Sequence, residues 1–230
     1  MSDAGTLEKV LTGAVAAVVA VDSGKASLDD VLDRSDVSCR RVSEHLLLNL
    51  FRFRKSIRRH WLQFCQRPPA PETAALLDAA LSQCLFQSAV APQSVVNVAV
   101  TMAKKTRADK FINAVMRKSL GKKWLLPSTA AEILPEALLK HWQKHFAAEE
   151  IEKFAGLFIS EAPFTFRLCG DAVLPENCTA VPVPGKFRFA RGNGREILNS
   201  PEFSAGKYYI QDPAAALYLI CVPHREANHC

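Results

Sequence analysis

Hydrophobic residues recur at helical spacing through most of the first 150 residues. The pattern is clearest between Val42 and Phe64, where apolar side chains fall on one side of a helical wheel and basic side chains on the other. Gly24 and the proline-rich stretch 67–71 interrupt it, as expected between helices. The sequence therefore predicts a mainly helical region with helices over residues 6–21, 27–32, 42–64, 72–85 and 135–146.

Two further helical patterns form a predicted hairpin over residues 91–121. Pro92 suits the first position of a helix, where its missing N–H costs nothing. Asp109 can cap the second helix, and Gly121 can end it. The elbow between the helices, residues 104–109, is basic. We therefore expect this hairpin to pack on one side and to present positive charge on the other.

The pattern changes after about residue 160, where apolar and polar residues alternate in short runs separated by glycines. Alternation with glycine turn signals predicts short strands, here in a small α+β unit. A last helical stretch follows over residues 214–221, and its apolar residues Leu217, Tyr218, Leu219 and Ile220 are expected to pack on a further domain. The predicted strands lie at 164–168, 181–183, 187–189 and 208–210.

Positive charge is concentrated in two segments. The net charge is only +6, but residues 40–67 and 104–123 each hold eight Lys or Arg and a single acidic residue. Such segregation indicates a polyanionic partner. A solvated polar face would explain the amphipathic helix 42–64, but it does not explain the single sign of that face, because like charges three or four residues apart repel. A phosphate-binding role is therefore favoured.

Catalytic, metal-binding and membrane motifs are lacking. The sequence contains no H-E-x-x-H and no G-x-S-x-G, and we expect no helix after the glycine-rich stretch 192–194. His141 and His145 could share a helix face, but no third ligand is evident, so we interpret them as surface residues and expect no metal. The seven scattered cysteines favour reduced thiols in the cytosol. The apolar run 10–21 is too short to span a bilayer and indicates a buried helix.

Four blocks of sequence carry a resemblance to a known family. Residues 90–97 and 110–117 resemble the core of a NusB-type helical RNA-binding domain, in the version found at the N-terminus of Sun/RsmB-type ribosomal RNA cytosine-5 methyltransferases. Residues 163–168 resemble the strand that enters a small RRM-like module of that family. Residues 206–214 resemble the segment before its catalytic domain. The resemblance covers most of residues 40–222.

The resemblance implies a mainly α fold, a NusB-like helical bundle, followed by a small α+β RRM-like module. The expected divisions are a NusB-like RNA-binding domain over residues 1–125, linker helices with the RRM-like module over 126–212, and the start of a methyltransferase domain that depends on S-adenosylmethionine over 213–230.

The implied function is RNA recognition for a 16S ribosomal RNA 5-methylcytosine methyltransferase in the cytoplasm, with small-subunit ribosomal RNA as the partner and no membrane. In that family the S-adenosylmethionine site and the two catalytic cysteines would follow Cys230. Cys221 and Cys230 match neither catalytic position, so we assign this chain no catalytic residue and no cofactor. The candidate RNA contacts are Arg52, Lys55, Arg59, Lys104, Lys105, Lys110, Arg117 and Lys118.

Several alternatives stay open at this point. Helix 6–21 lacks the arginines often found at its start in this family, so RNA contact there is not expected. Asn113 either contacts RNA or bonds to backbone where helices pack. The chain could also be a free-standing NusB-like factor in transcription antitermination. A bare helical domain of that kind would end near residue 125, so the second half of the chain argues against this alternative. A third alternative is a module whose basic faces bind an acidic protein partner.

Overall fold

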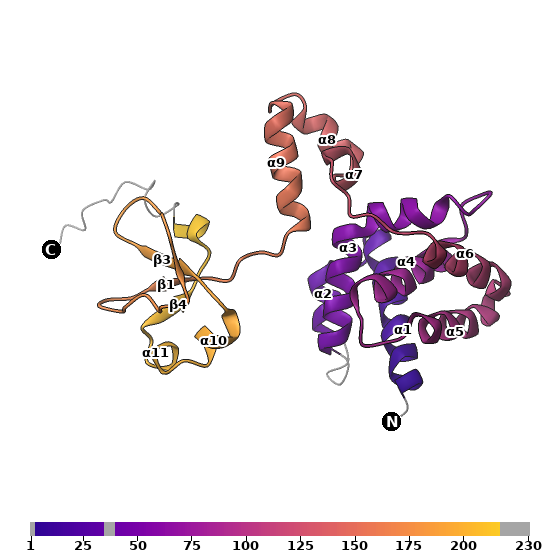
Figure 1. Ribbon diagram of the computed structural model, residues 1–230, viewed down its shortest axis with the longest axis horizontal. Helices are drawn as coiled ribbons and strands as arrows, with labels where there is room; N and C mark the ends of the chain where they lie inside the picture. Colours follow the sequence, from indigo (N-terminus) through magenta and orange to yellow (C-terminus); the bar gives the residue numbers. More distant parts are fainter. Residues whose placement is uncertain (1–2, 35–39, 217–230) are drawn as a thin grey trace. The chain divides into compact units, whose positions relative to one another are not determined.

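The computed structural model describes residues 3–34 and 40–216, which divide after Ser160 into two compact units (Figure 1). The first unit is helical, as the periodicity predicted. Its helices are α1 (Asp3–Asp22), α2 (Leu28–Asp33), α3 (Arg40–Leu62), α4 (Pro71–Phe86), α5 (Pro92–Ala103), the 3-10 turn η1 (Lys104–Thr106), α6 (Asp109–Gly121), α7 (Ala130–Ile133), α8 (Glu136–Trp142) and α9 (Ala148–Ile159).

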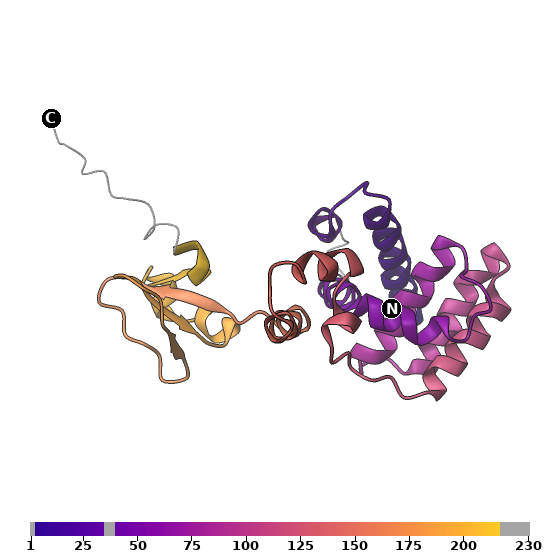
Figure 2. The same ribbon diagram turned by 90° about the horizontal axis from the view of Figure 1, so that it is seen from above.

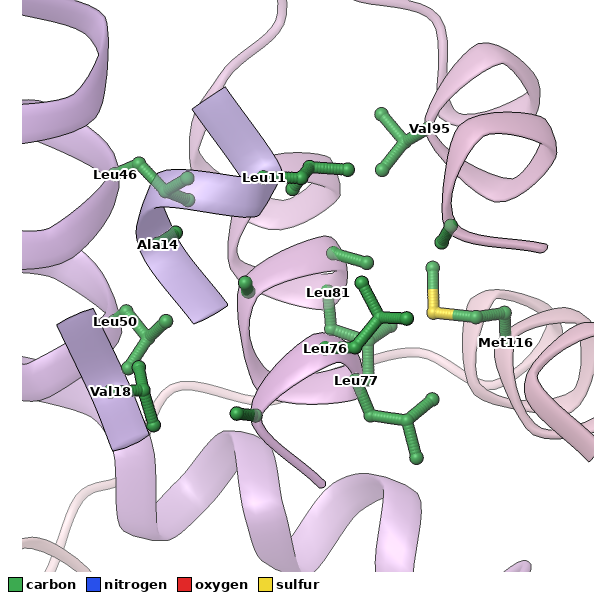
Figure 3. Packing of buried hydrophobic residues seen from close by; sticks show 14 of the residues in the cluster. Leu11, Ala14, Val18, Leu46, Leu50, Leu76, Leu77, Leu81, Val95 and Met116 are labelled. Atoms are coloured by element: carbon green, nitrogen blue, oxygen red, sulfur yellow. The ribbon is translucent and has the colours of Figure 1, made fainter. Parts of the chain in front are cut away.

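Helix α4 is the centre of the first unit. Every residue from Ala75 to Gln83 is buried, so this helix has no solvent-facing side along that stretch. A helix that is apolar all round is expected inside a core, and α4 packs against α1, α3, α5 and α6. Figure 3 shows its leucines between side chains of the surrounding helices, among them Leu11, Leu50 and Met116.

Helix α3 confirms the amphipathic pattern predicted for residues 42–64. Leu46, Leu50 and Ile57 have no exposed surface, and they lie on the side of α3 that faces α4. The helix ends at Leu62 rather than Phe64. Residues 63–64 form a turn, and the chain then runs to the prolines at 68 and 69, which disfavour helical backbone directly before them.

Helices α7, α8 and α9 form a small cluster of their own against α3. Leu134 and Ala155 are completely buried in it, and the Trp142 ring packs on Phe146, Phe154 and Phe158 with centroid distances of 5.7–6.1 Å. These helices belong to the first compact unit. The division predicted at residue 125 stays a prediction.

The second unit contains a four-stranded antiparallel sheet with two short helices. The strands stand in the order β2-β3-β1-β4, and α10 and α11 lie between β3 and β4 in the chain. The order matches that of a β-α-β-β-α-β module, but the described residues between β1 and β2 form no helix. The bounds are β1 (Thr165–Leu168), β2 (Thr179–Val181), β3 (Arg188–Arg191), α10 (Gly194–Leu198), α11 (Pro201–Ser204) and β4 (Tyr208–Ile210).

One face of this sheet carries the core of the second unit. Phe166, Leu168 and Tyr208 point from the strands toward that core, and Ile197 of α10 packs with them. The small α+β unit predicted after residue 160 is therefore confirmed. The residues Leu217, Tyr218, Leu219 and Ile220, which we expected to pack on a further domain, lie outside the described residues.

Candidate nucleic-acid interface

The α5–α6 hairpin presents an exposed basic surface. The two helices run side by side in both views (Figures 1 and 2), and Ile112, Val115 and Met116 of α6 are buried beneath them. The basic side chains lie on the opposite side of α6 and on the elbow, and within the described chain none of them forms an ion pair. We call these five residues the hairpin patch: Lys104, Lys105, Lys110, Arg117 and Lys118.

The elbow of the hairpin is closed by Arg107 in a left-handed backbone conformation, with φ of 58°. Its N–H donates to the Lys104 carbonyl at 3.1 Å, and the next N–H, that of Ala108, donates to the Ala103 carbonyl at 3.0 Å. These bonds satisfy carbonyls at the end of α5. Glycine is the usual residue at such a position because a Cβ is strained there. The arginine adds a further exposed charge next to the hairpin patch.

We expect the Arg107→Gly variant to gain about 0.5–1 kcal/mol of unfolding free energy, because glycine removes the left-handed strain but loses more backbone entropy on folding. Urea denaturation followed by circular dichroism measures this. The Arg107→Ala variant is the control, since it removes the same charge and keeps the Cβ. Equal stability of the two variants would contradict the strain argument.

Asn113 interacts within its own helix. Its side-chain oxygen accepts a hydrogen bond from Arg117 Nε at 3.1 Å, one turn further along α6. The hydrogen bond that the structure gives the Asn113 side chain is thus to the Arg117 side chain, not to the backbone where helices pack, and it orients Arg117. That geometry leaves the remaining donors of the guanidinium of Arg117 for an external acceptor.

Two arginines of α3 form an internal charge network rather than a free surface. Asp78 of α4 has no exposed surface and accepts from Arg58 Nη2 at 2.6 Å, Arg54 Nε at 3.4 Å and the Trp61 indole N–H at 2.8 Å. Arg54 also donates both terminal nitrogens to the carboxylate of Asp22 at the end of α1. Arg54 and Arg58 of α3 therefore form ion pairs that connect α3 with α1 and α4.

The three α3 residues predicted as RNA contacts have different surroundings. Lys55 donates its ammonium group to the main-chain carbonyls of Ala131 and Leu134. Arg59 forms an ion pair with Glu132 at 2.6 Å, although 70% of its side chain is exposed. Arg52 is half-buried and makes no ion pair within the described ranges. Their contact with RNA stays a prediction.

The carboxylate of Glu132 is strongly stabilised in its charged form. The backbone N–H of Ser128 and the guanidinium of Arg59 donate to it and lower its pKa from 4.5 to about 2. In the same way, the hydrogen bonds from Arg54 hold the pKa of Asp22 below its usual range. A carboxyl group whose pKa is lower in the folded protein than in the unfolded protein stabilises the fold at pH values above the unfolded-state pKa. This stabilisation is lost as the pH falls toward the folded-state pKa.

We therefore expect the stability difference between the unmodified protein and a Glu132→Gln variant to be full above pH 4.5 and to disappear near pH 2. The reason is that only the unmodified protein carries a carboxylate whose charge is favoured by folding. Thermal unfolding of both proteins across pH 2–7 measures the difference. A difference that stays constant over the whole range would show that the Glu132 carboxylate is not stabilised by folding.

Sequence reasoning missed a basic hollow where the ends of α3 and α6 meet. It has a volume of about 280 Å³, and Arg59, Lys122, Lys123 and Trp124 are among its lining residues. The two lysines were counted in the basic segment 104–123 but were not named as candidates. Only their position beside Arg59 in the fold distinguishes them from other surface lysines.

Sequence reasoning also missed the open face of the sheet in the second unit. Arg167, Phe189 and Tyr209 form one row across β1, β3 and β4, on the face away from the core; Phe189 is buried within this row, Arg167 is half-buried and Tyr209 is exposed. The Arg167 guanidinium lies 5.4 Å from the Phe187 ring centroid and 5.3 Å from that of Tyr209. Arg191 is exposed on the same face. Planar cations and aromatic rings of this kind can stack on nucleobases.

The described cysteines and histidines form no cluster suited to a metal ion. Cys65, Cys84, Cys169 and Cys178 are free, and burial raises the pKa of Cys84 to about 12, which keeps that thiol unreactive. No group of three metal-ligating side chains occurs in residues 3–34 and 40–216. In the same part of the chain, no helix is long and apolar enough to cross a membrane.

Comparison with known proteins identifies a family for the helical region. Residues 12–120 match the sequence model of the NusB family, so the chain contains a NusB family domain. A comparison with curated proteins finds no match. Among solved structures, PH0851 is similar with a TM-score of 0.53 over 93% of this chain, at 16% sequence identity. That likeness concerns the fold alone. This chain spans only 55% of the length of PH0851.

Proposed function

We propose that this chain binds RNA and that the NusB family domain at residues 12–120 carries the main contact. The observation that carries the proposal is the hairpin patch, five exposed cations on one hairpin without an ion pair in the described chain. Its backbone is fixed by the buried side of α6, so the charges are held in place for phosphates. Phosphate contacts of this kind supply most sequence-independent affinity for nucleic acid.

The more specific proposal is that the chain is the RNA-recognition region of a 16S ribosomal RNA 5-methylcytosine methyltransferase. Three features support it: the sequence resemblance, the order of a helical unit before a small antiparallel sheet, and a similar fold in a protein of nearly twice the length. S-adenosylmethionine and the catalytic cysteines would then belong to a domain after residue 230. Such an enzyme would meet its ribosomal RNA in the cytoplasm.

The sheet of the second unit would provide an additional RNA contact. Its open face offers the Arg167–Tyr209 row and Arg191, whereas Glu196 and Glu202 line a hollow on the side where Tyr208 points. These two glutamates lie away from the Arg167–Tyr209 row, which fits contact between that row and a single-stranded RNA. This assignment gives the small sheet of the second unit a role that follows from its own residues.

The test is a binding titration of the full chain against small-subunit ribosomal RNA fragments at several salt concentrations. We expect affinity for a subset of fragments to exceed that for unrelated RNA, with heparin as a competitor for both. Preference for an antitermination RNA would favour the free-standing NusB-like function instead. No RNA binding, together with capture of an acidic protein, would favour the protein-interaction alternative and contradict our proposal.

Sequencing the coding DNA beyond the codon for Cys230, in all three frames, tests the link to a methyltransferase. We expect a strand followed by a glycine-rich turn suited to S-adenosylmethionine. A reading frame without that motif would contradict the methyltransferase assignment and leave RNA binding as a separate function.

A further inference from the structure

A hollow of about 510 Å³ lies between the basic side of α3 and helices α7, α8 and α9, all within the first unit. On one wall lie Arg52, Lys55 and Arg58 of α3. On the other lie the apolar side chains of Leu138 and Phe158. Its volume is in the range of small-molecule sites, which typically combine apolar walls with a few polar groups.

The positive charge of this hollow is only partly compensated. Its lining contains four cations and no acidic side chain. Asp22 and Asp78 compensate Arg54 and Arg58 from behind. Lys55 is held by neutral carbonyl oxygens, and no ion pair of Arg52 is found in the described ranges. The hollow therefore retains charge that an anionic ligand would neutralise.

Arg58 also has an unused hydrogen-bond donor. Its Nη2 atom donates to Asp78 at 2.6 Å, but its buried Nε atom has no hydrogen-bond partner. That Nε atom has almost no exposed surface, so a ligand in the hollow would be bound by the terminal nitrogens of Arg58, which suit phosphate oxygens.

The apolar wall is suited to a flat ring. Phe158 is 52% exposed at the end of α9, although its ring packs edge-to-face against that of Trp142 with a centroid distance of 5.8 Å. Phe51 lies on the α3 wall, with the Arg54 guanidinium 5.5 Å from its ring centroid. Aromatic and guanidinium faces together are the surfaces on which nucleobases stack.

From this combination we infer that the hollow binds one unpaired nucleotide, with its phosphate toward Arg52 and Arg58 and its base on Phe158. The inference rests on the proposed RNA-binding function, because a nucleotide of a bound RNA strand is the ligand that this function supplies. A free nucleoside monophosphate has the same chemistry. The two sources can be separated by experiment.

The first measurement uses the full chain and single-stranded RNA that contains 2-aminopurine. We expect Phe158→Ala to weaken binding of this RNA about fivefold or more without changing the salt slope, because it removes a stacked base. We expect Arg52→Gln to lower the salt slope by about 0.7, the value for one phosphate of a single strand. Phe158→Tyr, which keeps the ring, should bind like the unmodified chain.

The controls are a second charge on α3 and a second form of RNA. Arg41 is exposed near the start of α3 and does not line the hollow, so Arg41→Gln removes the same charge elsewhere on the helix. Fully paired RNA offers no free base, and Phe158→Ala should not change its affinity. If Phe158→Ala binds single strands as the unmodified chain does and Arg52→Gln matches Arg41→Gln, the hollow is not a nucleotide site.

These outcomes separate the hollow from the proposed function. If substitutions in the hairpin patch still weaken RNA binding while those in the hollow do not, RNA binding stands and this inference falls. If the chain binds no RNA, a titration with the four nucleoside monophosphates decides. If the monophosphates bind and Phe158→Ala abolishes that binding, the hollow remains a nucleotide site. If they do not bind, or if an acidic peptide displaces them, the inference is overturned.

Discussion

We expect the Asp78→Ala variant to lose about 3–5 kcal/mol of unfolding free energy, because removing one partner of a buried ion pair leaves the other charge uncompensated. Asp78 has no exposed surface, and it accepts from Arg54, Arg58 and the indole N–H of Trp61. The substitution would leave the guanidinium of Arg58 and the indole of Trp61 without this acceptor at the junction of α3 and α4, whereas Arg54 would keep its pair with Asp22. Urea denaturation monitored by far-ultraviolet circular dichroism measures the loss.

Asp22 provides the matched control for this experiment. It binds the same Arg54, but 46% of its side chain is exposed. We expect Asp22→Ala to cost about 1 kcal/mol or less, as is usual for pairs that are accessible to solvent. Equal losses in the two variants would show that the buried position of Asp78 does not determine its contribution.

The second large effect concerns RNA affinity. We expect the triple variant Lys104→Gln, Lys110→Gln and Lys118→Gln to weaken binding on the order of 50-fold near 0.15 M salt and to lower the salt slope by about 2, because three phosphate contacts of a single strand are lost. The three lysines are exposed on the hairpin, so their loss should not affect the core. Fluorescence anisotropy with labelled RNA at several salt concentrations gives both quantities.

A triple variant of equal charge serves as the control. Lys140, Lys144 and Lys153 lie exposed on and between α8 and α9, and their replacement by Gln lowers the net charge by the same amount. This control should keep most of the affinity. If both triple variants lose RNA affinity equally, net charge determines binding, and the hairpin patch is not a specific RNA contact.

The first unit illustrates what periodicity can predict. The burial of Leu46, Leu50 and Ile57 on one side of α3 follows from spacing alone, because a helix places residues three or four apart on the same side. The roles of the arginines do not follow from spacing. A helical wheel gives the position of Arg58 on α3, but it does not show that Arg58 reaches Asp78, twenty residues later in the chain. A pattern within one helix contains no information about such a partner.

The same limit applies to Lys55 and Arg59, which the sequence assigned to phosphates. Both contact α7, a helix more than seventy residues further along the chain, through the carbonyls of Ala131 and Leu134 and the carboxylate of Glu132. The hairpin patch was easier to predict, since its helices, elbow and basic side are adjacent in sequence. Local patterns therefore located charges correctly, but they could not show which charges the fold itself uses.

The burial of α4 on all sides has a consequence for the folding of the first unit. Because α4 supports α1, α3, α5 and α6, water cannot reach it unless most of the surrounding contacts are lost. These helices are therefore expected to unfold together in one cooperative transition, and the amide protons of α4 should exchange with solvent only when that transition occurs. A partly unfolded form that keeps the α5–α6 hairpin while releasing α4 would have no core to support it.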